Sequence, residues 1–188
     1  MDFIEVLKEH QITVERLVEN CVGDIEEIAK ACGNALKNGR VIFLCGNGGS
    51  AADCQHIAAE LVGRFVTERR SLPAIALTTD TSNLTAISND YGYEQVFSRQ
   101  VEALVREGDV VIGISTSGSS KNVIRAFEAA KEKGAILIGM TGNKEGEIAK
   151  QVDICLKVPS IVTARIQECH IMVGHMVCAY IDEVIGIE

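Results

Sequence analysis

The sequence of 188 residues contains only 2 prolines, 4% aromatic residues and no long apolar run. So little proline, together with 47% apolar residues, excludes a disordered or low-complexity chain. Apolar stretches such as Val110–Ile114 have the length of a buried strand and fall far short of the roughly 18 residues that a membrane span needs. We therefore expect one domain, residues 1–188, with no membrane partner.

Positive charge is also scarce. The 18 Lys and Arg residues face 26 Asp and Glu residues, which gives a formal net charge of −8. A chain with this charge has no overall field that would hold it on nucleic-acid phosphates, so nucleic acid is not expected as a partner. An anionic substrate must instead be bound by a local site.

The sequence shows no C-x-x-C pair, and its cysteines are odd in number. They are Cys21, Cys32, Cys45, Cys54, Cys155, Cys169 and Cys178. Most lie in apolar contexts, which indicates reduced thiols in a core. The first residues, Met1 to Glu5, lack the basic start and apolar core of a signal peptide. These features predict a cytoplasmic protein.

Helical and strand-like patterns alternate along the chain. Residues 3–18 have a loose helical pattern, and residues 25–36 carry an apolar stripe at three- and four-residue spacing. Five unalternating apolar runs follow: Val41–Leu44, Ala74–Leu77, Val110–Ile114, Ile136–Met140 and Ile154–Val158. Such runs, separated by helices, are typical of a parallel sheet covered on both faces. We predict an α/β fold, a three-layer α-β-α sandwich with a five-stranded parallel sheet, a helical N-terminus and a long C-terminal helix over about 164–185.

A glycine-rich loop, residues 45–53, follows the first predicted strand. In open α/β sheets ligands bind beyond the carboxyl ends of the strands, so this loop is a candidate site. Its glycines let backbone N–H groups approach an anion, and the next helix adds its positive dipole end. Ser50 and Asp53 also fit a capping box, which is a purely structural explanation for both residues.

The same loop matches the dinucleotide pattern G-x-G-x-x-A at Gly46, Gly48 and Ala51. The acid that binds the ribose should follow roughly 20 residues later, at the end of the next strand. Asp80 comes too late for that position. We therefore do not expect NAD or FAD.

A second candidate loop is Ser115-Thr116-Ser117-Gly118-Ser119-Ser120, between a strand and a helix. Five hydroxyl side chains around one glycine at a helix N-terminus suit a phosphate monoester. Turn and N-cap chemistry accounts for one or two of them. No lysine follows in a G-K-[ST] pattern, so the loop is not a nucleotide P-loop. A small phosphorylated metabolite is the predicted ligand.

Two predicted helices carry candidate metal or proton-transfer residues. His56 and Glu60 lie at i and i+4 and share a face. The last helix carries Gln167, Glu168, His170 and His175. At 100° per residue, His175 can share a face with Gln167 or Glu168, whereas His170 points elsewhere. We expect His170 to pack or hydrogen-bond internally, with a position near the site as the alternative. Such a set could bind Zn²⁺ or transfer protons, although a single histidine is more often structural.

Four segments, in this order, resemble the sugar isomerase (SIS) domain family. They are Gly46–Ala52, His56–Glu60, Ser115–Gly118 and Ala164–Glu168. The serine-rich loop resembles the wider family, whose members bind phosphosugars. The combination of His56, Glu60, Gln167 and His175 is similar to the branch that isomerises phosphorylated seven-carbon sugars. The resemblance implies a homotetramer with active sites at subunit interfaces, to whose packing residues 1–38 contribute.

The resemblance also implies a reaction. D-Sedoheptulose 7-phosphate and D-glycero-D-manno-heptose 7-phosphate are interconverted through an enediol, the first step of bacterial ADP- or GDP-heptose biosynthesis. A proton moves between C1 and C2, so a carboxylate or imidazole must reach both carbons while another group polarises the carbonyl oxygen. By this resemblance Glu60 and His175 are catalytic. One Zn²⁺ per subunit is implied, with His56, Glu60, Gln167 and His175 as ligands.

The implied substrate contacts lie on several segments. They are Asn47, Gly48, Gly49, Ser50, Arg64, Asp90, Ser115, Thr116, Ser117, Ser120 and Gln167. Ala164 departs from the pattern, since some members have an acid at this position. Arg69 and Arg70 are expected to be solvated loop charges, with a phosphate contact as the alternative because Arg64 is close in sequence.

Other functions remain open at this point. One SIS-domain relative is a non-catalytic adaptor that binds a replication-initiator protein and lacks the full His/Glu/Gln/His set. A phosphosugar-binding regulator would need a DNA-binding extension, which is absent from this sequence. A related lyase would act on amino-sugar ethers. The isomerase is the preferred interpretation because the full set is present.

Overall fold

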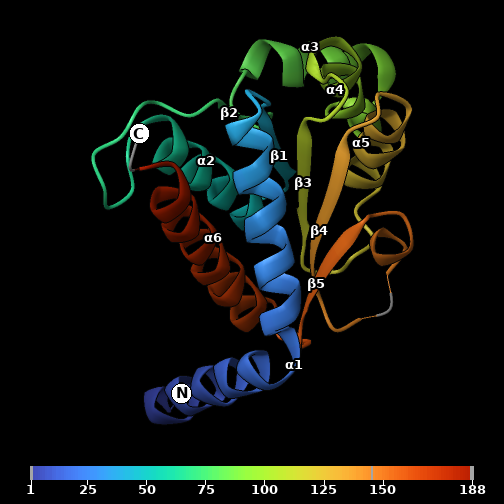
Figure 1. Ribbon diagram of the computed structural model, residues 1–188. Helices are drawn as coiled ribbons and strands as arrows, with labels where there is room; N and C mark the ends of the chain where they lie inside the picture. Colours follow the sequence, from blue (N-terminus) through green and yellow to red (C-terminus); the bar gives the residue numbers. More distant parts are fainter. Residues whose placement is uncertain (1, 145, 187–188) are drawn as a thin grey trace.

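The computed structural model describes residues 2–144 and 146–186, in which helices and strands alternate (Figure 1). The strands are β1 (Ile42–Gly46), β2 (Ala74–Ala76), β3 (Val110–Ser115), β4 (Ile136–Gly142) and β5 (Ile154–Val158). The helices are α1 (Phe3–Lys37), α2 (Gly49–Val62), α3 (Thr81–Tyr91), α4 (Ser98–Leu104), α5 (Lys121–Glu132) and α6 (Thr163–Ile185), with 3-10 turns η1 (Tyr93–Gln95) and η2 (Ile148–Lys150). The strands form one parallel sheet in the order β2-β1-β3-β4-β5. The predicted α/β fold with a five-stranded parallel sheet is confirmed.

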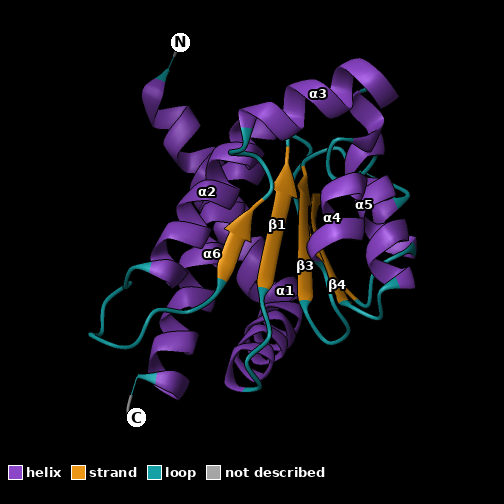
Figure 2. Ribbon diagram, turned by 90° about the horizontal axis from the view of Figure 1, so that it is seen from above, coloured by secondary structure: helices purple, strands orange, loops and turns teal. Residues whose placement is uncertain are grey.

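Helices cover both faces of this sheet. Successive side chains of a strand point to opposite faces, so Ile42 and Leu44 pack with α1, α2 and α6, while Phe43 and Cys45 pack with α4 and α5. Figures 1 and 2 show these two helical layers on either side of the strands. All five residues of β1 are buried. Burial on both faces explains why the runs in the sequence do not alternate between apolar and polar residues.

The two helical patterns expected near the N-terminus form one helix of 35 residues, α1. Asp2 caps it, since its Oδ1 accepts a hydrogen bond of 2.9 Å from the backbone N–H of Ile4. The first turns project away from the sheet (Figure 1), and they leave the large side chains of Phe3, Ile4 and Leu7 exposed. Neither α1 nor any other helix in the described ranges is long and apolar enough to cross a membrane.

Helices α3 and α4, between β2 and β3, carry no clear pattern in the sequence. Helix α3 buries none of its residues, so it lacks the apolar stripe by which a helix is predicted. Its N-cap is Asp80, whose Oδ1 accepts from the backbone N–H of Asn83 at 3.0 Å. Asp80 therefore has a structural role as the cap of α3.

The strand order places a topological switch point at the centre of the sheet. From β1 the chain moves to the edge strand β2, and it then crosses back to pair β3 on the other side of β1. Gly46 at the end of β1 pairs with Ile114 near the end of β3. The glycine-rich and serine-rich loops therefore leave the sheet side by side, where ligands bind in open α/β folds.

Candidate active site

The glycine-rich loop turns into α2 at Gly48, which has a φ of +57°. Gly48 is the N-cap, and no side chain caps the helix. The capping box at Ser50 and Asp53 is therefore wrong. The helix begins at Gly49, so both residues lie further along the helix than the N-cap and third positions that a capping box uses. Ser50 is instead buried in the first turn. The buried Oδ2 of Asp53 has no hydrogen-bond partner, and this burial raises the pKa of the Asp53 carboxyl.

The hydroxyls of the serine-rich loop bond to one another. The Oγ of Ser115 lies 2.8 Å from that of Ser120 and 3.3 Å from that of Ser117. Ser120 is the N-cap residue of α5, yet its side chain makes no capping bond. The hydroxyls therefore gather at the N-terminus of a 12-residue helix, where backbone N–H groups and the dipole favour an anion.

An amide pair that sequence analysis missed links the two loops. Asn47 and Asn122 exchange hydrogen bonds: Nδ2 of Asn47 donates to Oδ1 of Asn122 at 2.9 Å, and Nδ2 of Asn122 donates back at 2.8 Å. The hydroxyl of Tyr93 also donates to Oδ1 of Asn47, at 3.1 Å. The side-chain oxygen of Asn47 is thus occupied within the protein. A polar residue on the second position of α5 was the only signal for Asn122 in the sequence.

Helices α2 and α6 bring two imidazoles and a carboxylate together. The Nε2 atoms of His56 and His175 lie 2.8 Å apart, and Nε2 of His56 is 3.4 Å from Oε1 of Glu60. The ring of Phe65 stacks on His175 with a centroid distance of 5.5 Å. In a hydrogen bond between two neutral imidazoles, one Nε2 donates its N–H and the other Nε2 accepts. This cluster therefore holds groups that can give and take protons.

Gln167 lies at another point along the contact between α2 and α6, away from His175. It precedes His175 by eight residues on α6, a rise of about 12 Å along the helix axis. Its amide packs against Gly49: a Cβ on that glycine would lie 2.5 Å from Nε2 of Gln167. Within one chain, three of the predicted zinc ligands are thus adjacent, and Gln167 adjoins the glycine-rich loop.

The donor types of this cluster suit Zn²⁺, which binds imidazole nitrogen and carboxylate oxygen. The distance of 2.8 Å between the Nε2 atoms of His56 and His175 is that of a hydrogen bond. Two ligand atoms of a tetrahedral zinc ion lie about 3.3 Å apart. Over residues 2–144 and 146–186, no group of three or more His, Cys, Asp or Glu residues is arranged to hold a metal ion. Metal binding would therefore require the rings of His56 and His175 to separate by about half an ångström.

Two further predicted contacts, Arg64 and Asp90, lie on surface segments. Arg64, in the loop after α2, is exposed and has its Nε 3.7 Å from Oε2 of Glu68. Asp90, in the last turn of α3, accepts a hydrogen bond of 2.8 Å from Nδ2 of Asn89. Both side chains are free to reorient toward a ligand, since neither is buried.

Comparison with known proteins identifies the family. Residues 6–142 match the model described as "SIS domain". The phosphoheptose isomerase of a Nitratiruptor species is 60% identical over 94% of this chain and 95% of that protein, and the phosphoheptose isomerase of Aneurinibacillus thermoaerophilus is 52% identical over 98% and 94%. The solved structure of phosphoheptose isomerase GmhA from Neisseria gonorrhoeae superposes with a TM-score of 0.91 at 46% identity, covering 96% of each chain.

The chain belongs to the phosphoheptose isomerase branch of the SIS domain family. It is therefore an isomerase. The match to relatives covers nearly the whole chain and includes the segments that carry the two loops and the histidine cluster.

The expectation for Arg69 is also wrong. Arg69 is not a solvated loop charge: its side chain is 1% exposed, and its Nε donates to Oδ1 of Asp182 at 2.6 Å. Arg70 is exposed as expected. The difference arises because Asp182, 113 positions away, meets Arg69 only after α6 packs beside α2. No local pattern distinguishes the two neighbouring arginines.

His170 packs in the interior of the SIS domain, as expected. Its Nε2 lies 3.2 Å from the backbone oxygen of Thr141, and its buried Nδ1 has no partner. Because a carbonyl only accepts hydrogen bonds, Nε2 carries the proton and Nδ1 does not. Burial lowers the pKa of His170 to about 4. This histidine is therefore neutral at neutral pH and structural.

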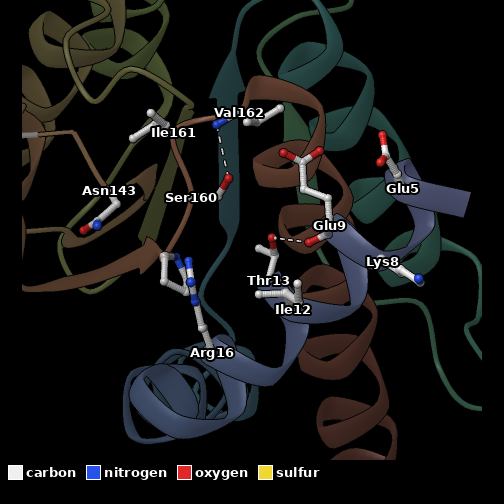
Figure 3. Close-up of a pocket in the computed structure, with 11 residues that line it drawn as sticks. Glu5, Lys8, Glu9, Ile12, Thr13, Arg16, Asn143, Ser160, Ile161 and Val162 are labelled. Atoms are coloured by element: carbon white, nitrogen blue, oxygen red, sulfur yellow. Dashed lines mark hydrogen bonds between the residues drawn. The ribbon is translucent and has the colours of Figure 1, made fainter. Parts of the chain in front are cut away.

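A cavity of about 470 Å³ lies apart from these residues, between the first half of α1 and the segments after β4 and β5 (Figure 3). Figure 3 shows Glu9, Ile12 and Arg16 of α1 facing Asn143 and Ser160. None of the predicted site residues lines it. The cavity is open and of mixed charge, and it is not part of the candidate active site.

Proposed function

We propose that this isomerase interconverts D-sedoheptulose 7-phosphate and D-glycero-D-manno-heptose 7-phosphate through an enediol. The observation that carries the proposal is the contact of His56, Glu60 and His175 at the junction of α2 and α6. The printed names of the relatives, phosphoheptose isomerase, support the choice of substrate. The product would enter ADP- or GDP-heptose biosynthesis for a bacterial lipopolysaccharide or capsule.

The serine-rich loop would hold the substrate phosphate. Hydroxyls of Ser115, Ser117 and Ser120 lie together at the N-terminus of α5, where the dipole adds to their hydrogen bonds. The backbone of residues 47–50 at the start of α2 would contact the sugar. Binding energy from the phosphate, remote from C1 and C2, holds the reacting carbons in place.

Glu60 and His175 would move the proton. One group removes a proton from C1 or C2 and returns it to the neighbouring carbon, while the other exchanges a proton with the carbonyl and hydroxyl oxygens. A carboxylate and an imidazole from facing helices suit these two tasks, since a carboxylate can accept a proton and an imidazole carries one nitrogen that donates and one that accepts. His56, at 2.8 Å from His175, would orient the second ring.

We also propose one Zn²⁺ per subunit. His56, Glu60 and His175 would hold it, with Gln167 as the fourth ligand implied by the family resemblance. When bound, the ion supplies polarisation of the substrate carbonyl. A lone pair that Glu60 or His175 donates to zinc is less available as a base, so the two roles compete.

A homotetramer and a cytoplasmic location complete the proposal. The exposed apolar side chains of Phe3, Ile4 and Leu7 support packing of α1 against other subunits. Seven unpaired cysteines support a reducing compartment. The measurement for assembly is the molar mass of the purified chain in solution.

The test of function is NMR of sedoheptulose 7-phosphate incubated with the purified protein, first stripped of metal and then supplied with Zn²⁺. A new aldose anomeric signal would establish the reaction, and its dependence on zinc would establish the metal site. If the folded protein produces no aldose in either condition, the proposed substrate is wrong, and the adaptor function, with the serine-rich loop as a phosphosugar sensor, becomes the alternative to test.

A further inference from the structure

Arg69 and Asp182 form a buried ion pair between the loop after α2 and helix α6. Their side chains are 1% and 4% exposed, and Nε of Arg69 is 2.6 Å from Oδ1 of Asp182. The other oxygen of Asp182 accepts from the backbone N–H groups of Val66 and Thr67, at 2.8 and 2.9 Å. Burial by itself raises the pKa of the Asp182 carboxyl, but these hydrogen bonds and Arg69 outweigh burial and lower the pKa. The charged carboxylate thus ties residues 66–69 to α6.

The guanidinium of Arg69 also completes the end of α2. Its Nη2 donates to the backbone oxygen of Glu60 at 2.9 Å, and its Nη1 donates to that of Leu61 at 2.9 Å. The last four carbonyls of a helix lack partners within the helix, and a cation near them is favourable. The last turn of α2, which carries Glu60, is therefore held by a side chain from the loop that follows it.

The same ion pair also holds the segment that packs against the His175 ring. Phe65 stacks on the His175 ring and directly precedes Val66, whose N–H group is held by Asp182. Asp182 follows His175 by seven residues, or about two turns of α6. One ion pair thus holds both the helix turn that carries Glu60 and the aromatic ring that packs against His175.

We propose that Arg69 and Asp182 are positioning residues for the isomerisation, holding Glu60 and His175 in their working geometry. This inference rests on the proposed function, in which Glu60 and His175 transfer the proton. A buried ion pair that served stability alone could be replaced by apolar residues of similar volume. A positioning pair cannot be replaced in this way, because apolar side chains do not bind the Glu60 carbonyl or the N–H group of Val66.

The double variant Arg69→Met/Asp182→Leu separates these two roles. We expect it to fold, with kcat for sedoheptulose 7-phosphate lowered about 10- to 100-fold, because misplacement of a reacting group by about 1 Å has an effect of this size. KM should change less than kcat, because the serine-rich loop that would hold the substrate phosphate connects β3 to α5, which do not carry the ion pair. A folded double variant with the wild-type kcat would overturn the proposal.

Two single variants complete the series. Arg69→Lys keeps a charge for Asp182 but loses the planar fork that binds several acceptors at once. We expect its kcat to fall as well, and if the double variant does not fold, a wild-type kcat in Arg69→Lys overturns the proposal. Arg70→Met, at the exposed neighbouring arginine, is the matched control and should keep the wild-type kcat.

A second measurement does not depend on turnover. Long-range ¹H–¹⁵N spectra report the ring nitrogens of all four histidines. In Arg69→Lys we expect the signals of His56 and His175 to shift, while those of His10 and His170 stay in place. Unchanged His56 and His175 signals would overturn the positioning role, whereas absence of turnover in the wild-type protein would overturn only the proposed substrate.

Discussion

The Nε2 atoms of His56 and His175 lie 2.8 Å apart, although 119 positions separate the two residues in the chain. Helices α2 and α6 pack side by side, so His56 of one faces His175 of the other. Glu60, one turn after His56 on α2, adds a carboxylate oxygen at 3.4 Å from the same nitrogen. The candidate proton-transfer groups are thus assembled by helix packing.

Glu60→Gln and His175→Ala should each leave the protein folded and lower kcat by roughly 10²- to 10⁴-fold, the usual contribution of a general acid or base. Both side chains lie at the edge of the helix contact and contribute little to the core, so the circular dichroism spectrum should be unchanged. The rate is measured with sedoheptulose 7-phosphate. Glu26→Gln, at an exposed glutamate of α1, is the control. Near-normal turnover in either site variant would refute the assigned roles.

Gly49→Ala should reduce kcat/KM with little loss of stability. The added Cβ would lie 2.5 Å from Nε2 of Gln167, and the end of this flexible side chain can move away. Movement of Gln167 changes the site rather than the core. Turnover and Tm are measured together, with Gly23→Ala as the control. A Cβ at Gly23 meets no atom within 4 Å, so this helix substitution should stabilise the protein by up to about 1 kcal/mol. An unchanged kcat/KM in Gly49→Ala would contradict a role for Gln167.

His170 should make stability depend on pH below neutrality. Its pKa is about 4 in the folded protein, because burial disfavours the charged ring, and near 6.5 in the unfolded chain. The unfolded chain binds a proton first as the pH falls, so stability that is complete above pH 6.5 is lost progressively toward pH 4. The loss amounts to roughly 3 kcal/mol.

Urea unfolding of the wild-type protein and of His170→Gln, at pH values between 7 and 4, measures this effect. Gln cannot take up a proton and can donate to the backbone oxygen of Thr141 in place of Nε2. The difference between the two proteins isolates His170 from other titrating groups. If both lose stability equally between pH 6.5 and 4, His170 does not titrate as its burial requires.

The thiols should react slowly in the native protein. Burial raises the pKa values of Cys32, Cys45 and Cys178 to about 12, and only the thiolate is nucleophilic. Cys155 is half-buried, whereas the other six cysteines are buried. With a chromogenic disulfide reagent at pH 8, we expect at most one thiol to react quickly and all seven to react after unfolding. Rapid labelling of several thiols in the native protein would contradict the packing of the cysteines.

The sequence predicted the sheet because the signals for it are local. Five apolar runs, each ending at turn residues, coincide with β1 to β5, and the absence of alternation indicated burial on both faces. The two candidate ligand loops were also visible, since glycine at a strand end and clustered hydroxyls at a helix N-terminus are typical of anion-binding loops. Helix α3 was missed because it buries no residue and so shows no stripe.

What the sequence could not determine is which distant side chains meet. Arg69 and Arg70 are chemically identical neighbours, yet only Arg69 is buried against Asp182. The Asn47–Asn122 pair, the contact of His56 with His175 and the packing of Gln167 on Gly49 also join separate elements. By itself the sequence determined the elements, the sheet and the residue types available to the site, because backbone preference and burial act over a few residues. The partners were decided only when the helices packed on the sheet, because their distances depend on the tertiary structure.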